Sequence, residues 1–182
     1  MVKRNKNQVR IVAGLIAILA IGAFVVFQFT KQANLSKIDS YEACVLAGFP
    51  ILESYPPKCQ VPNGKSYTQD IGNELEYSSE FLLSNPRPNQ KISSPLKVAG
   101  QARGMWYSEG TFSGELFDSN NESLGTFILT AQGTWMTEDL VPFKGVVKFE
   151  TPTTKKGTLI IKNANPSGIN ENEKAITVPV MF

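Results

Sequence analysis

Hydrophobic and polar positions follow two different patterns along this chain, and each pattern predicts a different element. Residues 11–29 form an apolar run of nineteen residues in which Gln28 is the single polar side chain. At about 1.5 Å of rise per residue, a helix of this length spans roughly 28 Å, close to the ~30 Å hydrocarbon core of a bilayer. The run therefore predicts one transmembrane helix over 11–29.

The charges before the apolar run predict its orientation. Four basic residues and no acidic residue precede it: Lys3, Arg4, Lys6 and Arg10. Because Lys and Arg gather on the cytoplasmic side, we expect a cytoplasmic tip over 1–10 and an extracytoplasmic location for the rest of the chain. A cleaved signal peptide is the alternative, but its apolar region is roughly 7 to 15 residues long and ends in a small-x-small site. Residues 24–29 are bulky instead, which favours an uncleaved, single-pass anchor in the cell membrane.

From residue 80 onward, short runs with a period of two predict β-strands, and Gly, Pro and Asn separate them. In the last run, Ile176, Val178 and Val180 share one parity, and Pro179, which lacks an N–H, indicates an edge strand. We expect seven strands, at 80–84, 95–102, 110–117, 124–131, 142–149, 157–163 and 174–181. Without any helical period between them, they predict an all-β domain over 80–182, an immunoglobulin-like antiparallel β-sandwich.

Three shorter segments are expected between the helix and the sandwich. Residues 30–40 read as a polar spacer, 41–68 as a two-cysteine mini-module and 69–79 as a polar, acidic linker. Within the mini-module we expect one or two helical turns that end at Gly48. The pair Asn63-Gly64 predicts the turn of a small hairpin.

Cys44 and Cys59 are the two cysteines of the chain. In an oxidising compartment an even pair predicts one disulfide, and a loop of this size is stabilised by about 3 kcal/mol in the chain-entropy model. Two free thiols are the alternative. Because fewer than 30 residues bury little core, the disulfide should supply most of the stability of the mini-module.

Composition narrows the classes of function. Once the four basic residues of the tip are set aside, 14 basic and 16 acidic residues remain, so no basic field is available for nucleic acid. The chain has no histidine, which excludes Ser-His-Asp and Cys-His catalysis and His-ligated metal sites. We therefore predict a protein that is not an enzyme and that needs no metal or cofactor.

Four side chains in two aromatic-rich segments are the candidate binding residues: Arg103, Trp106, Tyr107 and Trp135. Flat amphipathic rings suit a glycan or a partner peptide, and a guanidinium suits an anionic group. The alternatives are that Trp106 and Trp135 close the ends of the sandwich, and that Arg103 pairs with Glu109.

Acidic residues offer two further interpretations. Glu109, Glu138 and Asp139 could act as a carboxylate pair across a sugar bond, as in a glycan hydrolase. The pattern Asp118-x-Asn120-x-Glu122 resembles a calcium loop but has Ser123 where glycine is expected, so a simple hairpin turn is favoured.

Three blocks of sequence add a family resemblance. They read SPLKVAGQARGMWYSEGTF at 94–112, GTWMTEDLVPF at 133–143, and NPSG followed by AITVPVMF at 165–168 and 175–182. Together they resemble the immunoglobulin-like domain of bacterial spore germination, over roughly residues 82–182. The resemblance implies a bacterial, extracytoplasmic β-sandwich of the cell envelope.

Residues 41–68 resemble, more weakly, a short two-cysteine module of exported bacterial proteins. The sequence as a whole therefore predicts a membrane-anchored, non-catalytic binding or scaffolding protein whose partner is another envelope protein or a wall polymer. The alternatives are an envelope glycan hydrolase using Glu109, Glu138 or Asp139, and a structural spacer that presents the mini-module.

Overall fold

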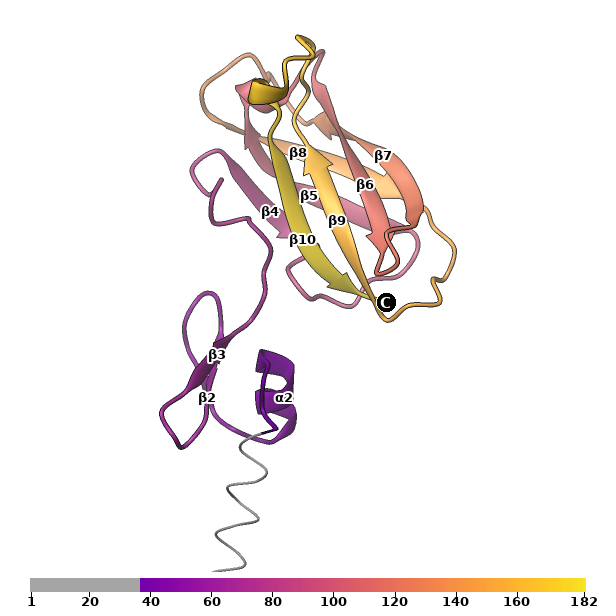
Figure 1. Cartoon of the computed structure of the whole chain (residues 1–182). Helices are drawn as coiled ribbons and strands as arrows, with labels where there is room; N and C mark the ends of the chain where they lie inside the picture. The colour runs from indigo at the N-terminus through magenta and orange to yellow at the C-terminus, as the bar shows by residue number, and fades with distance from the viewer. Residues whose placement is uncertain (1–36) are drawn as a thin grey trace, which may run out of the picture. The chain divides into compact units, whose positions relative to one another are not determined.

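The computed structural model describes residues 37–182 (Figure 1). They belong to two compact units, a small one that ends at Gln69 and a larger one over Asp70–Phe182. The predicted anchor over 11–29 and the predicted tip over 1–10 lie outside the described residues. Within residues 37–182, no helix has the length and apolar character that a membrane span requires.

The small unit begins with the helix α2, Tyr41–Leu46. The Ser40 side chain caps it by accepting the N–H of Ala43 at 3.1 Å. Its end is a Schellman arrangement, because the N–H of Gly48 donates to Val45 and that of Phe49 donates to Cys44. Gly48 has a φ of 79°, which glycine adopts without strain, so the predicted stop at this residue is confirmed.

A three-stranded antiparallel sheet completes the small unit, with β1 at Ile51–Leu52, β2 at Lys58–Gln60 and β3 at Ser66–Thr68. The predicted hairpin turn at Asn63-Gly64 joins β2 to β3. The predicted disulfide between Cys44 and Cys59 is present and joins α2 to β2. Both cysteines are fully buried, and they form the centre of a core with Ile38 and Val61.

The larger unit is an all-β fold whose seven strands run antiparallel in the order β10-β9-β6-β7-β8-β5-β4. Their bounds are β4 Phe81–Asn85, β5 Leu96–Arg103, β6 Thr111–Asp118, β7 Ser123–Ala131, β8 Leu140–Val147, β9 Lys156–Lys162 and β10 Ala175–Met181. Two short 3-10 turns accompany them, η1 at Gly104–Trp106 and η2 at Asn170–Asn172. All seven predicted strands are confirmed, and the largest shift of a boundary occurs at β8.

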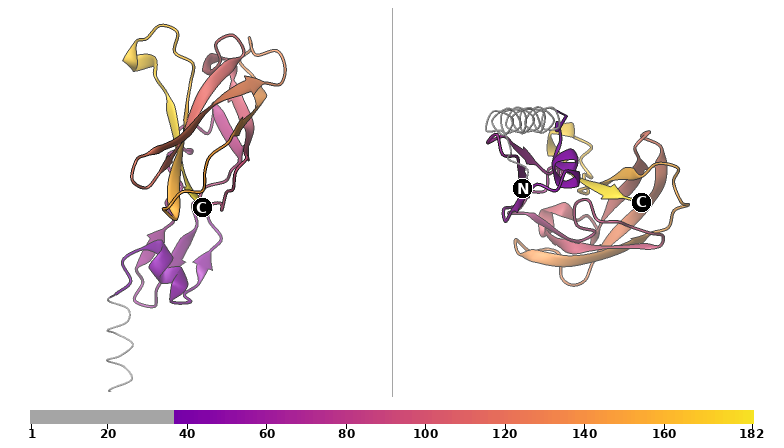
Figure 2. Two further views of the ribbon diagram at one scale, coloured as in Figure 1. Left: turned by 90° about the vertical axis from the view of Figure 1, so that its right-hand side faces the viewer. Right: turned by 90° about the horizontal axis from the view of Figure 1, so that it is seen from below.

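The sheet curls (Figure 2). Strands β7 and β8 are joined at two residue pairs, Thr130 with Lys144 and Ala131 with Phe143. The curl brings rings from distant strands together, since Phe143 of β8 meets Phe112 of β6 at a centroid distance of 5.0 Å. The core lies between β4, β5 and β8 on one side and β6, β7, β9 and β10 on the other. This is the two-layered core of an immunoglobulin-like sandwich.

Alternation along β10 sets the buried face. Ile176, Val178 and Val180 are fully buried, while Pro179 lies at the edge that faces away from β9. The carbonyl of Pro179 accepts the N–H of Asn89 on that outer edge. A proline nitrogen is tolerated there because no ladder hydrogen bond is lost, and the predicted edge position is confirmed.

Two irregular segments cover the outer edge of β10, one before β4 and one between β4 and β5. The first of them corrects the prediction of a linker over 69–79. Asn73 exchanges hydrogen bonds with Thr177 on that edge, and its side chain also donates to the carbonyl of Ala175 at 2.9 Å. Ile71 is buried as well. Asn73 therefore bonds to a strand edge, although Asp70, Glu76, Ser78 and Ser79 of the same segment are exposed.

Candidate functional site

The two aromatic-rich segments singled out in the sequence do meet at one end of the sandwich. The N–H of Gly104 donates to the carbonyl of Thr137 at 3.1 Å, so η1 lies against the loop between β7 and β8. The rings of Tyr107 and Trp135 lie 6.5 Å apart. The sequence therefore identified a real cluster, formed by the loops that follow β5 and β7.

The prediction that Trp106 and Tyr107 are contact residues is wrong, because both side chains belong to the core. Trp106 is 0 % exposed, and its ring packs at 4.7 Å from that of Phe81. Tyr107 is 5 % exposed, and its hydroxyl donates to the carbonyl of Val141. Trp106 thus closes the end of the sandwich, as the alternative interpretation held, whereas Trp135 is partly exposed.

Arg103 connects two loops. Its Nε donates to the carbonyl of Ser79 and its Nη1 to the carbonyl of Glu138, both at 2.8 Å. These bonds go to the backbone rather than to the carboxylate of Glu109, with which pairing was an alternative. The guanidinium therefore fastens the segment before β4 to the loop between β7 and β8.

The acidic candidates are turn and loop residues. Glu109 and Gly110 have φ angles of 49° and 72°, and the N–H of Thr111 donates to the carbonyl of Ser108, as in a two-residue hairpin turn with left-handed central residues. Glu138 and Asp139 are exposed in the loop before β8. Their positions are explained by loop structure.

Asp118 is buried at the end of β6, where one carboxylate oxygen accepts the N–H groups of Asn120 and Glu122. This arrangement is the hairpin turn that the sequence favoured over a calcium loop. Across the described part of the chain, no group of three or more His, Cys, Asp or Glu residues could hold a metal ion.

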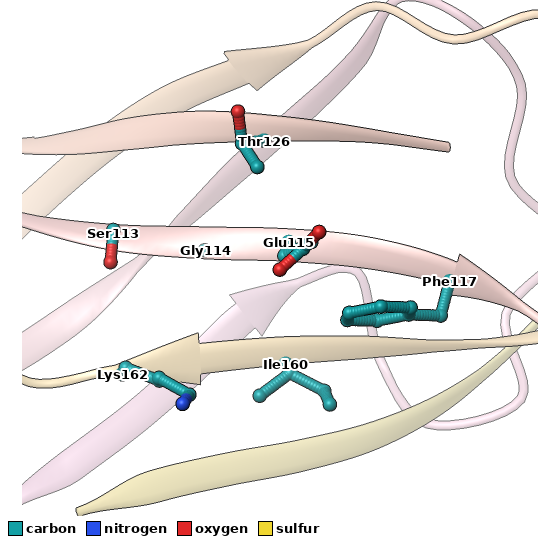
Figure 3. Close-up of a pocket in the computed structure, with 7 residues that line it drawn as sticks. All are labelled: Ser113, Gly114, Glu115, Phe117, Thr126, Ile160 and Lys162. Carbon is teal, nitrogen blue, oxygen red and sulfur yellow. The ribbon is translucent and has the colours of Figure 1, made fainter. Parts of the chain in front are cut away.

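A shallow hollow with a volume of about 220 Å³ lies on the outer face of β6, β7 and β9 (Figure 3). The strand register brings its side chains together, since Glu115 of β6 stands opposite Thr126 of β7 and opposite Ile160 of β9. The residues that line the hollow are Ser113, Gly114, Glu115, Phe117, Thr126, Ile160 and Lys162.

Two apolar side chains in this hollow point away from the core. Along β6, Leu116 is buried and Phe117 takes the opposite parity; along β9, Ile160 stands between the buried Leu159 and Ile161. Phe117 and Ile160 are partly buried. The pairing of β6 with β7 shifts register between Leu116 and Phe117, and an irregularity of this kind re-aims side chains.

Charged and hydroxyl groups surround these apolar side chains. The carboxylate of Glu115 accepts the hydroxyl of Ser123 at 2.5 Å, and the ammonium of Lys162 pairs with Glu173 at 2.7 Å. Since a carboxylate has about four acceptor sites and an ammonium has three donors, both groups retain hydrogen-bonding capacity. The hollow can therefore bind a group that combines apolar surface with donors and acceptors.

Sequence reasoning missed this hollow, although one signal was present. The buried parity of the third strand runs through Phe112, Gly114 and Leu116, so Phe117 is an aromatic residue of the outward parity. Ile160 likewise has the outward parity, because its neighbours Leu159 and Ile161 have the buried parity. Two such residues on different strands indicate a feature of the outer face once the strands are known to be neighbours.

Comparison with known proteins agrees with the resemblance. Residues 82–169 match the family model described as the immunoglobulin-like domain of bacterial spore germination. The match confirms the predicted family for this segment, which runs from β4 to the loop before β10 and includes all residues of the hollow. No curated protein and no solved structure matches the chain.

Proposed function

We propose that this chain is a non-catalytic binding protein on the outside of the bacterial envelope, held by a single N-terminal anchor over 11–29. Its sandwich contacts another envelope protein or a wall polymer through the outer face of β6, β7 and β9. The observation that carries the proposal is the hollow around Phe117 and Ile160, where apolar and polar side chains meet on an exposed sheet face.

Two observations support an extracytoplasmic binding role. The Cys44–Cys59 disulfide is typical of proteins in oxidising compartments, which agrees with the orientation predicted from the basic tip. The matched domain is immunoglobulin-like, and its description names no reaction. Such sandwiches present binding surfaces on a rigid core, so a hollow on their strands is held in a fixed shape.

The hydrolase alternative draws less support from the structure. Glu109 occupies a tight turn. Asp139 lies in a loop, where its own N–H donates to Oγ1 of Thr137. The spacer alternative differs in a measurable way, because it places all binding in residues 41–68 and none in the sandwich.

The test is capture of envelope components by the purified full chain in detergent. Ile160→Asp introduces a charge into the apolar part of the hollow, and Thr126→Lys adds one at an exposed position of its rim. Met136→Ser is the matched control, because Met136 is 76 % exposed on the same unit but does not line the hollow. We expect both hollow variants to capture at least tenfold less solubilised envelope protein or wall polymer than the control.

Hollow variants that melt cooperatively and capture as much as the unchanged chain would overturn the proposal. Such unchanged capture would favour the spacer, which places binding in residues 41–68, whereas absence of capture by the unchanged chain itself would overturn both the proposal and the spacer.

A further inference from the structure

The size of the hollow limits what it can hold. Its volume of about 220 Å³ lies below the ~300–1,000 Å³ of sites that enclose a drug-sized ligand. It therefore suits one ring or one side chain of a larger partner rather than a whole small molecule. The charges and hydrogen-bonding groups of the lining determine which group this is. This inference rests on the proposed function.

Charge restricts the group further. The hollow has one acid, Glu115, and one base, Lys162, and no other ionisable residue lines it. The two side chains come from neighbouring strands, with Ser113 of β6 as the register partner of Lys162. Charges of both signs lie in the lining, and Lys162 is also paired with Glu173. A charged group would therefore meet no field of one sign that offsets its loss of water, so the hollow favours a group without net charge.

The remaining side chains favour a group rich in hydroxyls. Phe117 and Ile160 offer apolar surface, whereas Ser113, Thr126, Glu115 and Lys162 offer donors and acceptors around it. A sugar ring has an apolar C–H face and hydroxyls that both donate and accept at its rim. We infer that the hollow binds one sugar ring of a neutral glycan outside the cell, with the ring against Phe117 and its hydroxyls toward Glu115 and Lys162.

An apolar peptide side chain fits this arrangement less well. It would use Phe117 and Ile160 but would displace water from Ser113, Glu115 and Thr126 without offering hydrogen bonds in return. Polar groups that lose water in this way cost binding free energy. A hydroxylated ring, in contrast, offers hydrogen bonds to these same residues.

The experiment is a titration of the full chain, held in a zwitterionic detergent without a sugar head group. The probes are a neutral tetramer of β-1,4-linked N-acetylglucosamine, its deacetylated cationic counterpart, and an oligogalacturonate as the anionic sugar. Calorimetry gives the dissociation constants, and amide chemical shifts locate the site. We expect the neutral tetramer to bind at least tenfold more tightly than either charged sugar and to shift the amides of Ser113, Glu115 and Ile160.

Variants distinguish recognition from folding. Phe117→Ala should weaken binding of the neutral tetramer at least tenfold, with Met136→Ser as the control that binds as the unchanged chain does. Glu115→Gln removes one charge while keeping the shape, so it should improve binding of the anionic sugar relative to the neutral one. A role of Glu115 in folding alone would not change this preference between sugars.

The outcomes separate this inference from the proposed function. Capture of an envelope protein that depends on Ile160, without binding of any sugar, overturns the glycan and leaves the binding surface in place. Absence of both capture and sugar binding overturns both. Equal binding of neutral and charged sugars, or shifts confined to amides far from the hollow, overturns the inference even though a sugar binds.

Discussion

The hydroxyl of Tyr107 donates a 2.8 Å hydrogen bond to the backbone carbonyl of Val141, and this bond joins the loop after β5 to β8. The ring of Tyr107 also meets that of Phe112 of β6 edge to face at 5.0 Å. One buried side chain from the loop after β5 thus contacts two strands of the curled sheet, β6 and β8. Trp106 and Tyr107 of this cluster therefore serve the fold, whereas Trp135 is partly exposed and stays a predicted contact residue.

Tyr107→Phe should lower the free energy of unfolding by about 0.5–1.5 kcal/mol, the usual net contribution of one hydrogen bond. The ring remains, but the carbonyl of Val141 loses its partner in a buried site. Urea unfolding of the full chain, followed by tryptophan fluorescence, measures the difference. A variant as stable as the unchanged chain would show that the hydroxyl contributes nothing.

The same residue should make the sandwich sensitive to alkali. Burial raises the pKa of Tyr107 to about 12 from an ordinary value of 10.0. The folded state therefore holds this proton more tightly, and the stability it contributes below pH 10 is lost as the pH rises toward 12. In Tyr107→Phe this loss should be absent, so the two stabilities should converge between pH 10 and pH 12.

Glu74 gives a second dependence on pH, on the acid side. It is 7 % exposed and pairs with Arg87, whose Nη2 lies 2.9 Å from Oε1 of Glu74. Burial raises the pKa of Glu74 above its ordinary value of 4.5, although the nearby Arg87 charge lowers it in part. The stability that this raised pKa contributes is present below pH 4.5 and is lost as the pH rises through the pKa of the folded state.

Glu74→Gln removes this titration. Unfolding measured at pH 4 and at pH 7 should show that the unchanged chain loses stability relative to the variant between the two values. Arg87→Met should enlarge the loss, because the buried carboxylate then charges without its partner. A constant difference between the unchanged chain and Glu74→Gln over this range would contradict the prediction.

Gly72 tests how closely the segment before β4 approaches β10. A Cβ added there would lie 1.7 Å from the carbonyl oxygen of Thr177, and the φ of 72° is already unfavourable for other residues. Gly72→Ala should therefore cost several kcal/mol, well above the ~1–2 kcal/mol of a left-handed residue alone. Gly168→Ala is the control in the same unit, because its φ is 65° but its Cβ would meet open space. Equal effects of the two changes on thermal unfolding would show that the segment is not packed.

The disulfide should matter to the small unit and not to the sandwich. Cys44 and Cys59 lie at the centre of a four-residue buried core, and closing their loop contributes about 3 kcal/mol in the chain-entropy model. Replacing both by serine should abolish hydrogen-exchange protection in residues 41–68. Protection of the sandwich strands should remain. Loss of protection in both units would show that they fold as one.

The strands could be predicted from the sequence because alternation reports burial wherever the backbone is extended. Ile176, Val178 and Val180 show this in β10. Alternation says nothing of irregular segments, so it could not decide whether Trp106 in η1 is a core or a surface residue. The polar residues before β4 were misleading for a related reason, because Asn73 directs its hydrogen bonds to a strand edge.

The hollow depends on which strands pair, and the alternation of residues along the chain does not reveal this pairing. Phe117 and Ile160 each have an outward parity, but their meeting requires that β6 and β9 be neighbours in a particular register. Those strands are separated along the chain by β7 and β8. Turn residues predict where each strand ends. They do not predict which strands pair when these lie far apart along the chain.

The most direct test of the account is the ratio of captured envelope material between Ile160→Asp and Met136→Ser, measured with the full chain at equal protein concentration. If the outer face of β6, β7 and β9 is the contact surface, Ile160→Asp should capture at least tenfold less than Met136→Ser while both variants melt cooperatively. Equal capture by the two variants would contradict the account and would place the contact surface away from the hollow.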